Sequence, residues 1–267
     1  MDWDEMARPR LATAPDLKAA FQEVYAAIFE AANLRPGERV LDVGCGTGPT
    51  LTAASEAVGT EGHVVGIDIV PPLLAAAAKR TSGAVELIVG DAGAYDFEAA
   101  RFDAIIANFG IMFFQDNAAA FANLRKAVRP GGRLIATVWG PPQQNPWFSM
   151  PRRCVDQVIA DVPRPDLTGP GPMRFGTPEG LIEALTSTGW APEVEPMDLL
   201  LHPPGPAERV TDLHMTLTVP MMLKGVEVTD DQLDAVRQLL LTASSADEQG
   251  NDVSVPAHIH VVTATAL

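Results

Sequence analysis

Cysteine is scarce in this chain, which has two, Cys45 and Cys154, among 267 residues. Two cysteines so far apart cannot build the disulfide framework of a small secreted domain, and we expect a reducing compartment. Clusters of cysteine and histidine at zinc-ligand spacing are also missing from the sequence. No metal site is therefore expected.

Long apolar runs are missing as well. No uninterrupted stretch approaches the ~18 residues that a membrane span requires. The opening, MDWDEMARPR, lacks the basic start and apolar segment of a secretion signal. We therefore expect a soluble, cytoplasmic protein without membrane contact.

Basic residues are few, since 19 Lys and Arg stand against 34 Asp and Glu, for a net charge of −15. The resulting field repels phosphate backbones, which argues against nucleic acid as a partner. The one basic cluster, at residues 125–133, lies before a predicted strand and is assigned to structure. Length and 47% hydrophobic content predict one large domain, or a domain with an appendage, around a substantial core.

Short β-branched runs alternate with Ala-rich helical stretches between residues 37 and 139. Strands are predicted over 39–43, 64–68, 85–89, 102–107 and 133–139, and helices over 49–58, 71–80 and 117–128. The strands are almost continuously apolar, so helices should cover both faces of the sheet. The pattern predicts an α/β fold with a doubly wound, mostly parallel sheet.

Segments with other patterns flank this block. Residues 15–33 predict one amphipathic helix, with Leu17, Phe21, Tyr25 and Ile28 on one stripe. Eight prolines make residues 140–172 connecting structure with one short helix near 153–160. Further elements are expected over 177–189, 206–224 and 230–244 (helices) and over 191–202 and 257–264 (strands). We expect an N-terminal helical extension over 1–36 and one domain over 37–267.

The sharpest motif is VLDVGCGTG at residues 40–48, where a hydrophobic strand leads directly into glycines 44, 46 and 48. Glycines allow the backbone to bend sharply and a ligand to approach the main chain. The dinucleotide spacing G-x-G-x-x-G is not met, and no Gly-Lys-Ser/Thr follows to hold a triphosphate. Asp42, two residues before the first glycine, is a better neighbour for a cation than for a pyrophosphate.

Two more carboxylates follow the next two predicted strands. Asp68 ends the second strand, in GIDI, and Asp91 follows the third, in GDA. An acidic residue at the end of the second strand commonly accepts hydrogen bonds from ribose hydroxyls. Because parallel strands share one carboxyl edge, these side chains should meet at one ligand site there.

With these motifs in this order, residues 37–139 resemble the class I S-adenosylmethionine-dependent methyltransferases. The resemblance continues through FDAIIANFGIMFF (102–114) and LRKAVRPGGRLIATVW (124–139). It implies a Rossmann-like, doubly wound seven-stranded sheet that closes with an antiparallel strand, and S-adenosyl-L-methionine as cofactor, with S-adenosyl-L-homocysteine as product. The N-terminal extension and a helical lid insertion, with covering segments 140–176 and 206–224, would lie over the cofactor cleft.

The resemblance also implies roles for individual residues. Asp42 and the backbone of the glycine turn (Gly44, Cys45 and Gly46, with Gly48 ending the turn) would hold the methionine moiety. Asp68 would accept hydrogen bonds from the ribose hydroxyls. The remaining expected contacts are Ile69 on one adenine face, Asp91 with the Ala92 amide at the adenine edge, and Asn108 and Phe109 beside the methionine end and the acceptor.

The acceptor and any general base are less defined by the sequence. Met and aromatic residues of the late segments favour a small, largely apolar acceptor, such as a natural product or secondary metabolite methylated on carbon, oxygen or nitrogen. Tyr25 and His214 are the candidates for a base, although each also fits a structural role. The chain is expected to act as a monomer or homodimer.

Two alternatives stay open at this point. A relative that keeps the cofactor site could catalyse cyclisation or rearrangement without methyl transfer, because cofactor motifs do not report the chemistry. A nicotinamide-dependent oxidoreductase is the weaker rival, since the glycine spacing and Asp42 argue against it.

Overall fold

The computed structural model describes residues 3–81, 85–246, 248–250 and 252–267. Its main sheet has seven strands in the order β3-β2-β1-β4-β5-β9-β6. These strands are β1 Arg39–Val43, β2 His63–Asp68, β3 Val85–Val89, β4 Phe102–Asn108, β5 Val128–Trp139, β6 Trp190–Leu201 and β9 Val255–Ala266. A second, two-stranded sheet joins β7 Glu248–Gln249 to β8 Asp252–Val253.

The first five strands run parallel, and β9 is antiparallel to both of its neighbours. The pairing of β9 with β5 runs from Arg133↔Thr265 to Trp139↔Ile259. The expected fold class, a mostly parallel seven-stranded sheet with an antiparallel last strand, is confirmed. The chain builds the sheet outward from β1 in one direction and then from β4 in the other, so the strand order changes direction between these two parallel strands. Their carboxyl ends form a topological switch point, where open α/β sheets bind ligands.

Helices cover both faces of the sheet because successive strand residues point to opposite sides. Val40, Val64 and Ala104 face α2 Gln22–Ala32, α3 Pro49–Val58 and α4 Pro71–Ala78. Their neighbours in sequence, such as Leu41 and Val65, belong to the other core, which includes α5 Asn117–Ala127 and α7 Glu179–Thr186. Burial on both faces explains why the strands lack polar alternation.

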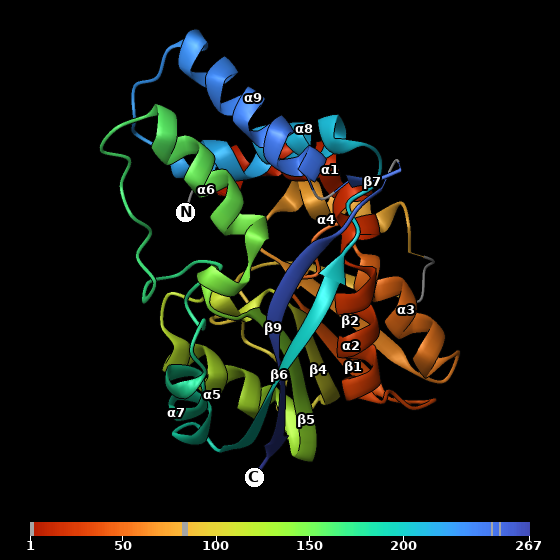
Figure 1. Ribbon diagram of the computed structural model, residues 1–267. Helices are drawn as coiled ribbons and strands as arrows, with labels where there is room; N and C mark the ends of the chain where they lie inside the picture. The colour runs from red at the N-terminus through yellow and green to blue at the C-terminus, as the bar shows by residue number, and fades with distance from the viewer. Residues whose placement is uncertain (1–2, 82–84, 247, 251) are drawn as a thin grey trace.

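A third group of helices lies beyond the carboxyl ends of the strands (Figure 1). It consists of α1 Trp3–Ala20, α6 Pro146–Val158, α8 Ala207–Met222 and α9 Asp230–Ala246. The short 3₁₀ turns η1 Ile111–Phe113 and η2 Pro142–Gln144 follow β4 and β5 in the chain. Helices α6, α8 and α9 share their own apolar core around Val155, Val219 and Leu240. None of the described helices is long and apolar enough to cross a membrane.

The single helix expected over 15–33 is wrong in its start and in its continuity. The chain is already helical from Trp3, passes through two prolines, and turns at Phe21 before α2. Packing of Ala7 against Val70 and Leu73 stabilises the early turns, a tertiary contact that helix propensity does not report. The end is confirmed, because Asn33 is a left-handed C-cap.

The short helix expected near 153–160 is also corrected. Helix α6 begins at Pro146 and ends at Val158. Proline is favourable in the first turn, where its missing N–H would have no helical partner. A proline-rich segment therefore supplies a helix of 13 residues that reaches the cavity.

Candidate functional site

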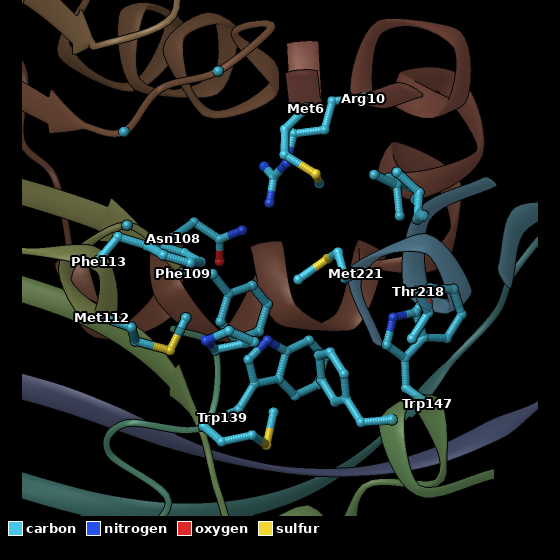
Figure 2. A pocket seen from close by; sticks show the side chains of 18 of the residues that line it. Met6, Arg10, Asn108, Phe109, Met112, Phe113, Trp139, Trp147, Thr218 and Met221 are labelled. Carbon is cyan, nitrogen blue, oxygen red and sulfur yellow. The ribbon is translucent and has the colours of Figure 1, made fainter. Parts of the chain in front are cut away.

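A cavity of about 1050 Å³ opens at the carboxyl ends of the parallel strands. One wall consists of the turns that follow β1, β2, β3 and β4. Side chains of α1, α2, α6 and α8 form the facing wall. Figure 2 shows residues of both walls pointing into the same space.

The glycine turn after β1 supplies a cradle of bare backbone. Gly44, Gly46 and Gly48 have positive φ values of +71°, +54° and +80°, which side chains rarely adopt. A Cβ on Gly44 would lie 3.2 Å from the Cα of Gly110, so the two loops approach too closely for side chains. Gly44, Cys45 and Gly46 all line the cavity, as does Gly110.

Cys45 is a packing residue of this turn. Its side chain is buried with Leu51, and a Cβ on Gly66 would lie 2.9 Å from its Sγ. Burial raises the pKa of the thiol, so it stays protonated. Because the side chain is buried, its backbone is the part that would contact a ligand in the cavity.

Asp42 lies behind the turn and does not itself line the cavity. One oxygen accepts a 2.5 Å hydrogen bond from the hydroxyl of Thr50, which does line it. The other oxygen, Oδ1, is buried and has no partner among the described residues. Burial raises the pKa of Asp42 to about 7, and the Thr50 hydrogen bond only partly opposes this. A cation bound nearby would restore the charged form.

Asp68 is fixed where β2 ends. Its Oδ2 accepts from the amide of Gly46 at 2.8 Å, and its Oδ1 accepts from the amide of Val70 at 2.9 Å. Burial raises its pKa in spite of these bonds. Since a carboxylate offers about four acceptor positions, two amides leave room for further donors, such as the hydroxyls of a ribose.

The remaining expected contact residues also line the cavity. Ile69 is 45% exposed, which is unusual for a large apolar side chain in this protein and suits a flat apolar ligand. Asp91 accepts from the amide of Gly93 at 2.8 Å and precedes the buried Ala92. The described structure thus brings every expected cofactor residue except Asp42 and Gly48 to the cavity wall.

The loop after β4 contributes Asn108 and Phe109 to the cavity wall. The hydroxyl of Thr137 donates to Asn108 Oδ1 at 2.7 Å, which leaves the amide N–H groups of Asn108 free to point into the cavity, as in Figure 2. Phe109 has a positive φ of +57°, a strained value for a residue with a bulky side chain. This conformation stacks its ring on Trp139 at 4.3 Å between ring centroids.

An aromatic cluster extends from Phe109 along the wall that the helices form. Phe21, at the turn between α1 and α2, makes edge-to-face contacts with three rings at 5.8 to 5.9 Å, namely Phe109, Trp139 and Trp147. Phe148 packs edge-on against Trp139 at 5.0 Å. All of these rings line the cavity. Sequence patterns identified Phe21 only as part of an amphipathic stripe.

The two candidate bases lie in different environments. Tyr25 lines the cavity, but burial, with the charge of Asp42, raises its pKa to about 12. His214 is fully buried behind the wall, where its Nδ1 lies 3.2 Å from the hydroxyl of Thr218 and its ring lies 4.7 Å from Trp147. Burial lowers its pKa to about 4. Thr218 lines the cavity whereas His214 does not.

Arg10 is a cavity residue that sequence analysis missed. Its guanidinium points into the cavity from α1 (Figure 2). Burial lowers its pKa, and the nearby charge of Asp68 raises it. The expected helix began at residue 15, so Arg10 fell outside every predicted element.

Comparison with known families agrees with the geometry. Residues 40–132, which include the turns after β1, β2 and β3, match the family model of a methyltransferase domain. No group of residues in the described part of the chain has the composition of a metal site.

Two similar proteins are methyltransferases by name. Nocamycin O-methyltransferase of Saccharothrix syringae is 36% identical over 184 residues, which are 64% of this chain and 65% of the relative. Aklanonic acid methyltransferase of a Streptomyces species is 38% identical over 105 residues, 38% of this chain and 48% of the relative. The chain therefore spans about half to two thirds of these relatives.

Solved structures share the fold. The [4+2]-cyclase SpnF superposes with a TM-score of 0.53 at 19% identity, over 91% of this chain and 80% of that one. At this identity the likeness concerns the fold alone.

Proposed function

Because the chain belongs to the class I S-adenosylmethionine-dependent methyltransferases, we propose that it transfers a methyl group to a small, largely apolar acceptor, a natural product or secondary metabolite. The observation that carries the proposal is the continuous cavity of about 1050 Å³, with a polar backbone cradle in one half and an aromatic cluster in the other. Natural-product methyltransferases among the relatives support this choice of acceptor class.

The residues present fit S-adenosylmethionine, the cofactor of this family. The glycine cradle leaves space against the main chain, Asp68 has free acceptor positions, and the buried Oδ1 of Asp42 lacks a partner. When bound, the cofactor supplies a methyl group already activated by a sulfonium. Asp68 would bind the ribose hydroxyls, Ile69 and Asp91 with Ala92 the adenine, and Asp42 with Thr50 the amino-acid end.

Catalysis by the chain then consists of orientation and exclusion of water. Asn108 and Phe109 lie where the two halves of the cavity meet, so they would hold the acceptor atom in line with the methyl group. The aromatic cluster around Phe21 excludes water from the reacting atoms. Tyr25, with a pKa of about 12, stays protonated and would donate a hydrogen bond rather than act as a base.

Two measurements test the proposal. Calorimetric titration with S-adenosylhomocysteine should show micromolar binding, whereas reduced nicotinamide dinucleotide should not bind. In turnover with an acceptor, the product mass should increase by one methylene. A product of unchanged mass would instead favour cyclisation or rearrangement, and binding of the nicotinamide alone would make the chain an oxidoreductase.

Acidic composition and cavity shape support a small-molecule partner over nucleic acid. We further propose a cytoplasmic location, monomer or homodimer assembly, and lid functions for segments 140–176 and 206–224. Helices α6 and α8 of these segments contribute Trp147, Phe148, Thr218 and Met221 to the cavity wall.

A further inference from the structure

The charge of the cavity wall is opposite to the charge of the protein. The chain has 34 acidic and 19 basic residues, but six basic and three acidic residues line the cavity. Two of the three acidic residues, Asp68 and Asp91, lie in the cofactor half. The third, Asp156, is paired with Arg152 at 2.7 Å and with Arg164 at 2.9 Å. The cavity wall as a whole therefore has more basic than acidic side chains, and its one acidic residue outside the cofactor half is already paired.

Arg10 is the cation of this wall that most needs a partner. It extends from the apolar stripe of α1 that includes Met6, Leu17 and, beyond the helix end, Phe21. Among the described residues Arg10 makes no hydrogen bond and no ion pair, whereas Lys224 at the same cavity pairs with Glu5 at 3.1 Å. A guanidinium stays charged in a protein. The charge of Asp68 is near enough to favour the charged form of Arg10, but the two make no ion pair, so the guanidinium keeps hydrogen-bond donors that an anionic ligand could use.

The second observation is that the cavity offers no general base. Among the described residues no histidine lines it, and Tyr25 stays protonated at neutral pH. Asp156 is held by two arginines, Asp68 accepts two backbone amides, and Asp91, at the expected adenine edge, accepts the amide of Gly93. An alcohol of high pKa would need one of these groups to take its proton. An acceptor that is already ionised would need no group of the cavity to take a proton.

We propose that the acceptor is an apolar acid, with a carboxylate or an equally acidic hydroxyl as the methylated group, and that Arg10 binds this anion. The inference rests on the proposed function. The ionised oxygen attacks the methyl carbon, the new O–C bond forms as the C–S bond breaks, and the electron pair stays on sulfur. No proton has to be removed in the cavity, because the acceptor lost it to solvent before binding.

The cofactor also carries a carboxylate, at its amino-acid end, so the test must separate the two anions. Four proteins are compared as full chains: wild type, Arg10→Gln, Arg10→Lys and Arg8→Gln. Arg8 is exposed on the same helix and does not line the cavity, so its variant matches the loss of charge. Each protein is titrated with S-adenosylhomocysteine by calorimetry and its melting temperature is recorded.

The probes for the acceptor site are matched acids and amides. 2-Naphthoate and 2-naphthamide, and anthraquinone-2-carboxylate and its amide, are titrated into protein with and without saturating S-adenosylhomocysteine. Wild type and Arg8→Gln should bind each acid at least about tenfold more tightly than its amide, the loss expected for one charge-assisted hydrogen-bonded pair. Arg10→Gln should reduce the preference to within about twofold, and Arg10→Lys should retain part of it.

Affinity for S-adenosylhomocysteine should stay within about twofold in all four proteins. A loss confined to the Arg10 variants would assign Arg10 to the cofactor carboxylate and overturn the proposal. Absence of an acid preference in wild type, or an unchanged preference in Arg10→Gln, would overturn it as well. If wild type binds no S-adenosylhomocysteine, the proposed function fails, and the acid–amide comparison without it still decides the role of Arg10.

Discussion

The two halves of the cavity are built in different ways. The proposed cofactor half consists of turns that directly follow β1, β2 and β3, and it offers glycine backbone and carboxylates fixed by nearby amides. The acceptor half is assembled from side chains of α1, α6 and α8, which lie far apart in the sequence. This contrast suggests that cofactor recognition depends on short local motifs, whereas acceptor recognition depends on how remote helices pack.

The largest expected effect lies in the cofactor half. Asp68→Ala should weaken binding of S-adenosylhomocysteine roughly 10- to 150-fold, because charge-assisted hydrogen bonds worth ~1.5–3 kcal/mol are lost. Calorimetry measures the affinity, and Asp68→Asn, which keeps one acceptor oxygen, should lose less. An unchanged affinity in folded Asp68→Ala protein would remove Asp68 from the ribose site.

In the acceptor half, a substitution with an effect of similar free energy should lower the stability of the fold and not the affinity for the cofactor. Phe21→Ala removes the ring that contacts three other aromatic rings, and we expect the free energy of unfolding to fall by about 2–3 kcal/mol. Urea denaturation measures this loss, with Phe21→Leu as the milder control. Affinity for S-adenosylhomocysteine should change less than threefold, and a larger loss would contradict the division into two halves.

A pH effect should follow from Asp42, whose pKa is about 7 in the folded protein. If its carboxylate binds the amino group of the cofactor, S-adenosylhomocysteine should bind up to about tenfold more tightly at pH 8 than at pH 6. Asp42→Asn should remove this dependence, as calorimetry at both pH values would show. An equal dependence in Asp42→Asn would assign it to another group.

The same shift affects the stability of the protein without ligand. Because the folded pKa of Asp42 lies above its unfolded value of about 4, the folded state binds more protons between these values. The contribution of Asp42 to the free energy of unfolding is therefore present below about pH 4 and is lost as the pH rises through about 7.

The smallest expected effect concerns Tyr25. Tyr25→Phe should lower affinity for S-adenosylhomocysteine about two- to tenfold if its hydroxyl donates one hydrogen bond. Its effect on kcat should stay below tenfold, because a phenol with a pKa of about 12 is not a base at neutral pH. A fall in kcat of a hundredfold or more would show that Tyr25 does act as the base.

Sequence patterns predict the sheet and helices α8 and α9 well, but they misplace the starts of α1 and α6. The bounds of β1, α3 and β3 are as expected, since each depends on a short apolar run that ends at glycine, proline or aspartate. Helix α1 was predicted twelve residues too late, and α6 seven residues too late. In both, proline suggested a boundary, but tertiary packing carried the helix across it.

The sequence by itself determined the doubly wound sheet, the glycine turn and the carboxylates at the strand ends. These features follow from local periodicity and from residues next to each other in the chain, because parallel strands bring their carboxyl ends to one edge. Only the tertiary structure decided that Arg10, Phe21, Trp147 and Thr218 line one cavity and that His214 lies behind its wall. Contacts between helices hundreds of residues apart depend on the shapes of packed surfaces, which no local pattern records.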